Sequence, residues 1–408
     1  MATRLRLRFP AIDMPLAGAT LGLVVFGLLT VFSATTVPGA HQGLWQKQLL
    51  WAALAFGAAW IAIAIPFRVF DSLAWPAYLA SVVMLAAVLL VGTSAMGARR
   101  WLDLGPLRFQ PSELAKIATV WLLARTFDRP KLDLRRMGDW LPPLILVLVP
   151  MALVAREPDL GTSLAFPVML VAMYFWAGMP AGQLALGISP VLNVVLFFVT
   201  GSLLWFAGIF ALLLAVLRPR PVVLAVVLAL NAGVSYAVPH LWDRMPDYQK
   251  RRIETFLNPG NDPYGAGYQI IQSRIAIGSG GLAGKGYLQG SQKALAFLPM
   301  RHTDFVYSVV GEEFGFIGSL TVVLLYALLV LRGFRIALVA RSRFASLMAV
   351  GLVTALFFHI LVNMLMTIGW APVTGLPLPL LSYGGTALVV NAVQIGLLQN
   401  VALRIREG

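Results

Sequence analysis

The residues best suited to chemistry lie in one long polar segment, Arg251–Phe305, which interrupts a chain of mostly apolar runs. The segment is rich in glycine and charged residues and contains no apolar run long enough to cross a bilayer. Near its centre, Asp262 precedes Pro263. A carboxylate held near apolar surface has a raised pKa and can serve as a general base. An Asp-Pro pair is also an ordinary helix start, with Asp262 as the N-cap of a helix over Tyr264–Ile277.

A second polar stretch, Gly97–Lys116, ends at the start of an apolar run. Ser112 is the expected N-cap of a helix there, which places Glu113 and Lys116 three residues apart on one helix face. An acidic residue in the first turn is favoured by the helix dipole, and a local ion pair would explain both residues. The alternative is a pair that faces a polar cavity, as ionisable residues in membrane proteins usually do.

Asp159 closes a tight turn between two apolar runs, where it either caps the following helix or lines a polar cavity. His302 and Asp304 are either catalytic or hold down the end of the long polar segment, and the second role is the one expected here. His359 and Asn363 are four residues apart in an apolar run, a spacing typical of interhelical hydrogen bonds.

The glycine-rich stretch Gly278–Gly286 superficially resembles a P-loop. It fails the pattern, because Ser279 stands where the first glycine belongs and Gly286 where a hydroxyl must bind magnesium. The stretch is either a plain flexible loop or a cradle that binds a lipid pyrophosphate through backbone N–H groups. Further along, the proline-rich segment Pro372–Thr386 is non-helical at membrane depth, so it must be buried in protein or line a cavity.

The composition indicates a polytopic membrane protein. Of 408 residues, 59% are hydrophobic and 12% charged, about half the roughly 25% charged residues of a soluble domain. The chain has no cysteine and only four scattered histidines, which excludes disulfides, thiolate metal sites and a zinc cluster. The net charge of +14 comes from loops between apolar runs and fits anionic headgroups or a phosphate-bearing lipid better than nucleic acid.

We predict an all-α membrane bundle of ten core transmembrane helices, which forms a single domain over residues 1–408. An extra short hairpin is expected at 183–217, turning near Gly201-Ser202, and a large extracytoplasmic loop at about 242–305 separates the seventh and eighth core spans. The expected spans are 14–36, 48–66, 74–93, 112–127, 140–155, 160–178, 222–241, 306–331, 345–366 and 384–403.

The distribution of basic residues predicts the orientation. Three arginines precede the first span, which is best explained as a retained signal anchor. With the N-terminus inside, the short loops carry 17 Lys and Arg on the inner side against 6 on the outer side. Both termini are therefore expected in the cytoplasm of a bacterium, with the chain in its cytoplasmic (inner) membrane. The four polar stretches then share the outer face, where no nucleotide is available.

Several long motifs in this chain are specific enough to indicate a family. They are GARRWLDLGPLRFQPSELAK, REPDLGTS, NPGNDPYGAGYQIIQSRIAIGSGGLAGKG, FLPMRHTDF with GEEFGFIG, and PVTGLPLPLLSYGGT. Together they resemble the SEDS family (shape, elongation, division and sporulation), and GLPLPLLSYGG with IAIGSGGLAGKG resembles its RodA branch rather than its FtsW branch. The resemblance runs from about Asp13 to Leu403. The stretch 183–217 departs from it, because it is longer than expected between the sixth and seventh family spans.

The resemblance implies a peptidoglycan glycosyltransferase that polymerises lipid II into a growing glycan strand for cell-wall elongation and rod shape, releasing undecaprenyl pyrophosphate. Such proteins work in the lipid bilayer beside a class B penicillin-binding protein, which supplies the transpeptidase. The family's essential loop aspartate matches Asp262, and its cavity Glu and Lys match Glu113 and Lys116. The turn aspartate matches Asp159, and the tryptophan of the first motif matches Trp101.

This activity requires a base for the attacking sugar hydroxyl and cationic groups that offset the charge building on the pyrophosphate. We assign the catalytic role to Asp262. A divalent cation, Mg²⁺ or Mn²⁺, is compatible with the reaction, although no ligand cluster indicates a metal site. The candidate substrate or cavity residues are Glu113, Lys116, Asp159, Trp101, Arg99, Arg108, Lys285 and Ser382.

Two other functions stay open. A lipid II flippase would suit a polar cavity within ten spans, although the internal repeat that many transporters have is not evident. In a flippase, Glu113, Lys116 and Asp159 would matter more than Asp262. The other alternative is a non-catalytic scaffold of a cell-wall complex.

Overall fold

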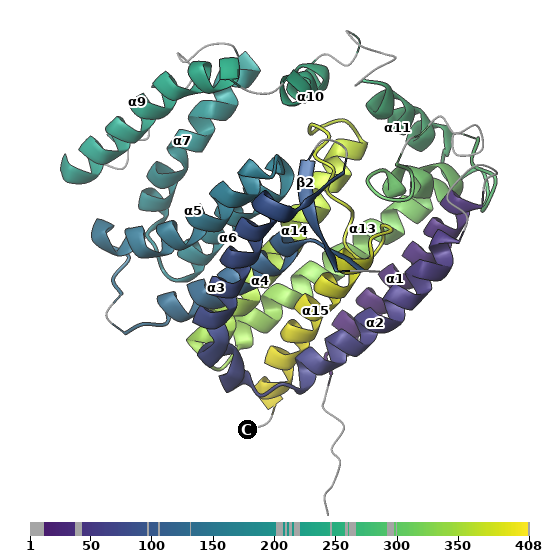
Figure 1. Ribbon diagram of the computed structural model, residues 1–408, viewed down its shortest axis with the longest axis horizontal. Helices are drawn as coiled ribbons and strands as arrows, with labels where there is room; N and C mark the ends of the chain where they lie inside the picture. The colour runs from purple at the N-terminus through teal and green to yellow at the C-terminus, as the bar shows by residue number, and fades with distance from the viewer. Residues whose placement is uncertain are drawn as a thin grey trace, which may run out of the picture.

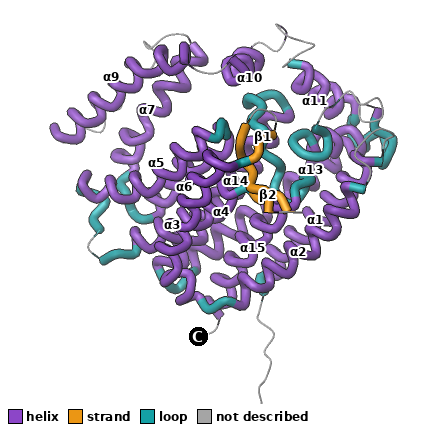
Figure 2. The backbone as a smooth tube through the Cα atoms, in the orientation of Figure 1, coloured by secondary structure: helices purple, strands orange, loops and turns teal. Residues whose placement is uncertain are grey.

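The computed structural model describes residues 12–36, 43–95, 98–104, 107–130, 132–200, 207–208, 210–211, 214–215, 221–244, 247–257, 260, 267–291, 298 and 300–406. Within these residues the chain forms a bundle of α-helices with one small three-stranded sheet (Figures 1 and 2). The sheet and the short helices of the long polar segment lie at one end of the bundle, and the C-terminal end of the chain lies at the other.

All ten predicted core spans are present as helices, which confirms the polytopic α-helical fold. The first six are α1 (Met14–Thr35), α2 (Leu44–Ala64), α3 (Phe67–Val91), α4 (Pro111–Phe127), α5 (Leu141–Arg156) and α6 (Leu160–Trp176). The last four are α9 (Pro221–Arg244), α13 (Val306–Val339), α14 (Arg343–Thr367) and α15 (Gly385–Arg406).

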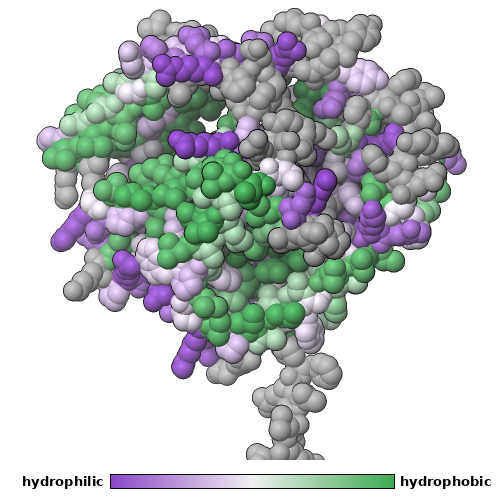
Figure 3. All heavy atoms as spheres, in the orientation of Figure 1, coloured by the Kyte–Doolittle hydropathy of each residue, from purple (hydrophilic) through white to green (hydrophobic). Residues whose placement is uncertain are grey.

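Eight helices in the described part of the chain are long and apolar enough to cross a membrane, whereas α4 and α6 have only 17 residues each. Nearly every residue of α4 is buried inside the bundle, whereas α6 exposes Leu164 and Phe175 on one side. A helix surrounded by protein does not need to match the bilayer thickness, so the polar first turn of α4 is tolerated there. Apolar side chains are exposed on the outer helices and face the place of the lipid (Figure 3).

The core is centred on α14, which contacts α4, α6, α13 and α15. Its buried side chains interlock with apolar residues of α4 and α6, such as Leu123, Phe166 and Met169. This arrangement leaves the outer helices to bury one stripe each, and it fixes the relative positions of the polar residues at the ends of α4, α6 and α14.

The segment predicted as a hairpin contains α7 (Ala181–Thr200), a 20-residue apolar helix that contacts α9. Two asparagines join these helices: Asn193 Nδ2 lies 2.8 Å from Ser235 Oγ, and Asn231 Nδ2 lies 2.9 Å from Ser189 Oγ. The turn predicted at Gly201-Ser202 lies outside the described residues.

The polar stretch before α4 forms an antiparallel sheet of β1 (Thr93–Ala95), β2 (Ala98–Leu104) and β3 (Leu107–Phe109). Sequence analysis predicted no strands here. Thr93 is opposite Trp101, and Asp103 is opposite Arg108. Because β2 contacts both α3 and α4, the sheet covers one end of the bundle. Its last strand, β3, leads directly into α4.

The long polar segment is partly helical, with α10 (Asp247–Leu257) and α11 (Tyr268–Ser279) beside the sheet end of the bundle (Figure 1). The helix expected at Tyr264–Ile277 corresponds to α11, whose N-cap is Gly267 rather than Asp262. Asp262 itself lies outside the described residues.

The glycine-rich turn after α11 is docked on α13 rather than free. Gly315 has a φ of 62°, a conformation suited to glycine, and it kinks α13. The kink leaves carbonyls of α13 without helical partners, and the N–H groups of Lys285 and Gly286 bond to those of Glu312 and Glu313 at 3.0 and 3.1 Å. These N–H groups are therefore used within the protein, which corrects the expectation of a pyrophosphate cradle at these positions.

Candidate active site

A buried ammonium group joins α4 to α14. The side chain of Lys116 is only 2% exposed, and its Nζ lies 2.8 Å from Glu113 Oε1 and 2.9 Å from His359 Nε2. The predicted i,i+3 ion pair and the predicted interhelical role of His359 are both confirmed. Because an ammonium group only donates hydrogen bonds, Nε2 of His359 is the acceptor and the ring proton lies on Nδ1.

The N-cap of α4 lies two residues before the predicted one. Pro111 is the first helical residue and Gln110 is the N-cap, so Ser112 lies inside the helix. A proline suits the first helical position because its φ is already helical and its missing N–H needs no partner. This start still leaves Glu113 in the first turn, where the helix dipole favours a carboxylate.

Asp159 caps a helix, which is one of the two roles predicted for it, and its side chain also belongs to a buried polar cluster. It is the N-cap of α6 and accepts hydrogen bonds from the backbone N and the hydroxyl of Thr162 at 3.1 and 2.9 Å. The same carboxylate accepts from Gln110 Nε2 at 3.2 Å and lies 3.8 Å from Arg100 Nη1. Gln110 therefore links this cluster to the first turn of α4, next to Glu113.

Glu157 lies beside this cluster and is completely buried. Neither of its carboxylate oxygens has a hydrogen-bond partner among the described residues. The pKa of Glu157 is raised to about 8, first by burial and then by the neighbouring charge of Asp159, with Arg100 opposing both. The side chain is therefore protonated at neutral pH and can donate a hydrogen bond.

The non-helical segment before α15 closes this end of the bundle. Asn363 Nδ2 on α14 donates to the carbonyls of Asp304 and Leu376 at 3.0 and 2.7 Å, and no group in the described structure bonds to its Oδ1. A Cβ on Gly161 of α6 would lie 2.9 Å from Thr374 Cβ, so the segment packs directly on α6. The segment is buried in protein, as its depth in the membrane requires.

Ser382 belongs to this closing segment. Its Oγ donates to the carbonyl of Thr303 at 2.6 Å and accepts from the backbone N of Leu378 at 2.8 Å. The carbonyl of His302 accepts from the backbone N of Tyr383 at 2.8 Å, which confirms that the end of the long polar segment is held down. The hydroxyl of Ser382 is thus engaged in fixing two loops together.

The remaining candidate residues lie on the small sheet or in the long polar segment. Arg108 on β3 is 71% exposed and pairs with Asp103 at 3.3 Å. Lys285 is bonded to Glu312 Oε1 and Ser291 Oγ at 2.8 and 2.7 Å. Trp101 and Arg99 both lie on β2, and the position of the Arg99 side chain is not among the described features.

Three residues of this site were not among the predicted ones: Arg100, Glu157 and Gln110. A signal for Arg100 existed, because it directly follows the candidate Arg99 in the sequence. Glu157 is two residues from Asp159. That spacing alone does not show which of the two carboxylates caps the helix and which is buried without a hydrogen-bond partner.

The arrangement concentrates carboxylates, an ammonium group and a guanidinium group in a buried zone at the sheet end of the bundle. Such intramembrane polar groups mark a functional site by default. Within the described ranges, no three His, Asp or Glu side chains come together as a metal-ligand set.

Comparison with known proteins identifies the family. The FtsW/RodA/SpoVE model, described as "Cell cycle protein", matches residues 14–203 and 194–407. The chain belongs to the FtsW/RodA/SpoVE family. Peptidoglycan glycosyltransferase MrdB of Escherichia coli K12 is 39% identical over 390 residues, covering 93% of this chain and 90% of MrdB. A probable peptidoglycan glycosyltransferase FtsW of Geobacter metallireducens is 33% identical, covering 97% of this chain and 95% of that protein.

Solved structures of this family share the fold. A chain of the structure described as "Structural coordination of polymerization and crosslinking by a peptidoglycan synthase complex" is 32% identical with a TM-score of 0.73, covering 98% of this chain and 99% of that one. Thermus thermophilus RodA is 28% identical with a TM-score of 0.65, at the same coverage. The helical bundle described above is therefore the family fold along nearly the whole chain.

Proposed function

We propose that this chain is a peptidoglycan glycosyltransferase that polymerises lipid II in the bacterial cytoplasmic membrane, for cell-wall elongation and rod shape. The family match along nearly the whole chain, with relatives named peptidoglycan glycosyltransferases, carries this proposal. The buried cluster of Glu113, Lys116 and Asp159 supports it, because that cluster lies at the end of the bundle beside the long polar segment.

In the proposed reaction, a sugar 4-hydroxyl attacks the anomeric carbon that bears the lipid pyrophosphate. The new C–O bond forms as the bond to the pyrophosphate breaks, and undecaprenyl pyrophosphate leaves. Asp262 takes the hydroxyl proton as general base. Arg108 is a suitable partner for the departing pyrophosphate because it is exposed and has only one surface ion pair. Lys116 and Lys285 are already paired with carboxylates, so a phosphate would have to displace those contacts.

The proposal includes a class B penicillin-binding protein as the partner that crosslinks the new strands. The structural relative from a peptidoglycan synthase complex, which couples polymerisation to crosslinking, supports this partner. We also propose cytoplasmic termini and an outward-facing long polar segment, on the charge bias of the short loops.

The test is polymerisation of labelled lipid II by the purified chain with its penicillin-binding partner. Asp262→Asn keeps the shape of the side chain and removes the base, so the yield of glycan strands should fall by at least about 100-fold. Glu254→Gln is the matched control, because Glu254 is an exposed carboxylate in the same polar segment, and it should retain activity. Equal strand yields from Asp262→Asn and the wild type, with both folded, would overturn the base assignment.

The flippase alternative remains because a buried ion pair on α4 that is hydrogen-bonded to His359 of α14 would also suit a transporter. In that case Lys116→Met would abolish movement of fluorescent lipid II between the leaflets of a vesicle, and Asp262→Asn would not. Absence of strands from the wild type with a competent partner would favour the flippase or a non-catalytic scaffold.

A further inference from the structure

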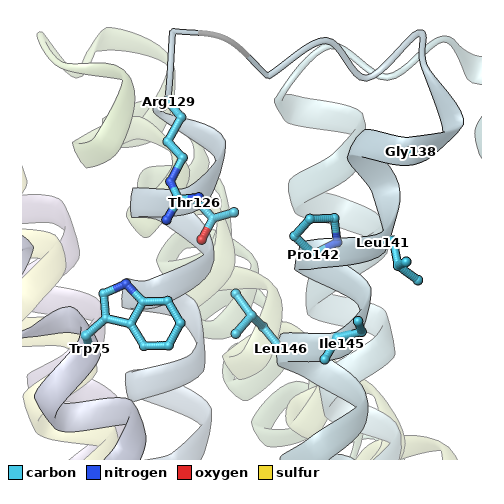
Figure 4. A pocket seen from close by; sticks show the side chains of 8 residues that line it. All are labelled: Trp75, Thr126, Arg129, Gly138, Leu141, Pro142, Ile145 and Leu146. Carbon is cyan, nitrogen blue, oxygen red and sulfur yellow. The ribbon is translucent and has the colours of Figure 1, made fainter.

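A separate groove opens at the end of the bundle opposite the candidate active site. It has a volume of about 330 Å³ and lies between α3, the C-terminal end of α4 and the start of α5 (Figure 4). The candidate site is at the other end of α4, where Glu113 and Lys116 lie in the first two turns, whereas the groove residue Thr126 lies in the last turn. The groove therefore belongs to a different membrane surface, which the charge bias assigns to the cytoplasmic side.

The walls of the groove are apolar and turned away from the bundle core. Trp75 of α3 stands on one side, and Ile145 and Leu146 of α5 stand on the other. Trp75 and Ile145 are 39% and 48% exposed. In a membrane these surfaces are covered by acyl chains, because apolar side chains at the rim of a bilayer have no other apolar partner there.

The groove is preformed. Behind it, the Tyr78 hydroxyl on α3 donates to the carbonyl of Leu146 on α5 at 2.9 Å, and Tyr78 is buried. This bond fixes the distance between the two walls. A site that already has its bound shape does not lose ordering entropy when a ligand enters.

A cation lies over the groove. The Arg129 side chain reaches down beside Thr126 toward Trp75 in Figure 4. In the described structure Arg129 makes no ion pair, whereas Arg125 pairs with Asp71 and Arg136 pairs with Asp133, both at 3.5 Å. Two acidic groups on this side are thus already paired with other arginines.

Two other polar groups lie at the rim of the groove, the Thr126 hydroxyl and the Trp75 indole N–H. The Thr126 hydroxyl donates to the carbonyl of Leu122 at 2.7 Å, so it is satisfied within its own helix. No hydrogen bond of the Trp75 indole N–H is recorded among the described residues, and the Trp75 ring lies edge to face with that of Tyr78. One guanidinium group and one indole N–H are therefore free to bind a ligand above the apolar walls.

We propose that this groove is a binding site for one anionic phospholipid. The phosphate lies against the Arg129 guanidinium group, the Trp75 N–H donates to the headgroup or ester region, and an acyl chain fills the space between α3 and α5. Basic pockets between helices at the cytoplasmic surface favour anionic headgroups. Tryptophan and arginine both prefer the headgroup level, where an apolar body and a polar tip are satisfied together.

The test is native mass spectrometry of the purified full-length chain, titrated with phosphatidylglycerol or phosphatidylcholine that carry the same acyl chains. The wild type should retain phosphatidylglycerol at least about fivefold better than phosphatidylcholine. Arg129→Gln should reduce phosphatidylglycerol retention to the phosphatidylcholine level. Arg136→Gln is the matched control, because it removes the same charge from the same loop outside the groove and should retain the preference.

A second variant tests the groove without touching the charge. Ile145→Trp fills the space between the walls and should lower retention of both lipids, with folding checked by thermal unfolding. Equal retention of the two lipids by the wild type would overturn the proposal. The same loss in Arg136→Gln as in Arg129→Gln would also overturn it, because general surface charge would then explain the binding. Unchanged retention in Ile145→Trp would exclude the groove.

Discussion

At the scale of single residues, Lys116 shows how the bundle tolerates charge in its interior. Its ammonium group has lost nearly all contact with water, and Glu113 and His359 replace that contact at 2.8 and 2.9 Å. Such a pair adds little net stability, because desolvation of both charges offsets their attraction. Removal of only one partner is costly, because it leaves the other charge buried and unpaired.

Lys116→Met should therefore lower the free energy of unfolding by about 3 kcal/mol. The double variant Lys116→Met with Glu113→Gln should recover most of this loss, because no charge is left unpaired. Thermal unfolding in detergent measures both effects. If the two single losses instead add in the double variant, the residues do not act as a compensated pair.

Glu157 gives a pH dependence of the opposite sign to that of an ordinary salt-bridged carboxylate. Its pKa is about 8 in the folded chain against 4.5 normally. Between these pH values the folded state binds more protons than the unfolded state, so stability falls as pH rises through this window, by up to about 1.4 kcal/mol per pH unit.

Glu157→Gln removes this titration, so its unfolding temperature should fall less than that of the wild type between about pH 5 and 8. Thermal unfolding of both proteins across that range is the measurement. Parallel curves for the two proteins would show that Glu157 is charged in the folded state, which would contradict its burial without partners.

At the scale of elements, the non-helical segment before α15 ties α6 to α1. A Cβ on Gly27 of α1 would lie only 2.7 Å from the carbonyl oxygen of Leu381 and 2.8 Å from that of Leu380. A Cβ on Gly161 of α6 would meet Thr374 in the same segment. Glycine is required at position 27 because the backbone of the segment approaches α1 there, and at position 161 because side chains of the segment pack against α6.

Gly27→Ala should therefore destabilise the protein by about 1–3 kcal/mol, as overpacking of a closed interior does. Gly18→Ala is the matched control on the same helix, since nothing lies within 4 Å of its Cβ position. That variant should be neutral or slightly stabilising, because alanine favours the helix. Equal effects of the two substitutions on the unfolding temperature would contradict the close contact.

At the scale of the whole molecule, the helices separate two polar ends. The sheet, α10 and α11 lie at one end, and the C-terminal end of α15 lies at the other (Figure 1). The chain has no cysteine, so single cysteines can report which end faces outward without background labelling.

We expect Asp103→Cys on β2 to react with a membrane-impermeant maleimide in intact cells, and Arg341→Cys between α13 and α14 to react only after the cells are opened. Both positions are exposed. The reverse labelling pattern would invert the proposed orientation and place Asp262 on the cytoplasmic side, where it would not meet an outward-facing substrate.

The class of fold, the ten core helices, the family and the ion pair of Glu113 with Lys116 could all be predicted before the structure was known. These features depend on local signals: apolar runs of about 20 residues, basic short loops and an i,i+3 spacing. The small sheet and the first residue of α4 were missed, because short elements depend on the neighbours they pack against.

The contacts between distant polar groups could not be predicted, because they depend on how the helices pack. Lys116 reaches His359 across 243 positions of sequence, and Arg100 reaches Asp159 across the sheet end of the bundle. The glycine-rich turn is used to satisfy a kink in α13 rather than to hold phosphate. Buried polar groups must find partners wherever packing brings them together, and that packing is set by the whole bundle rather than by local spacing.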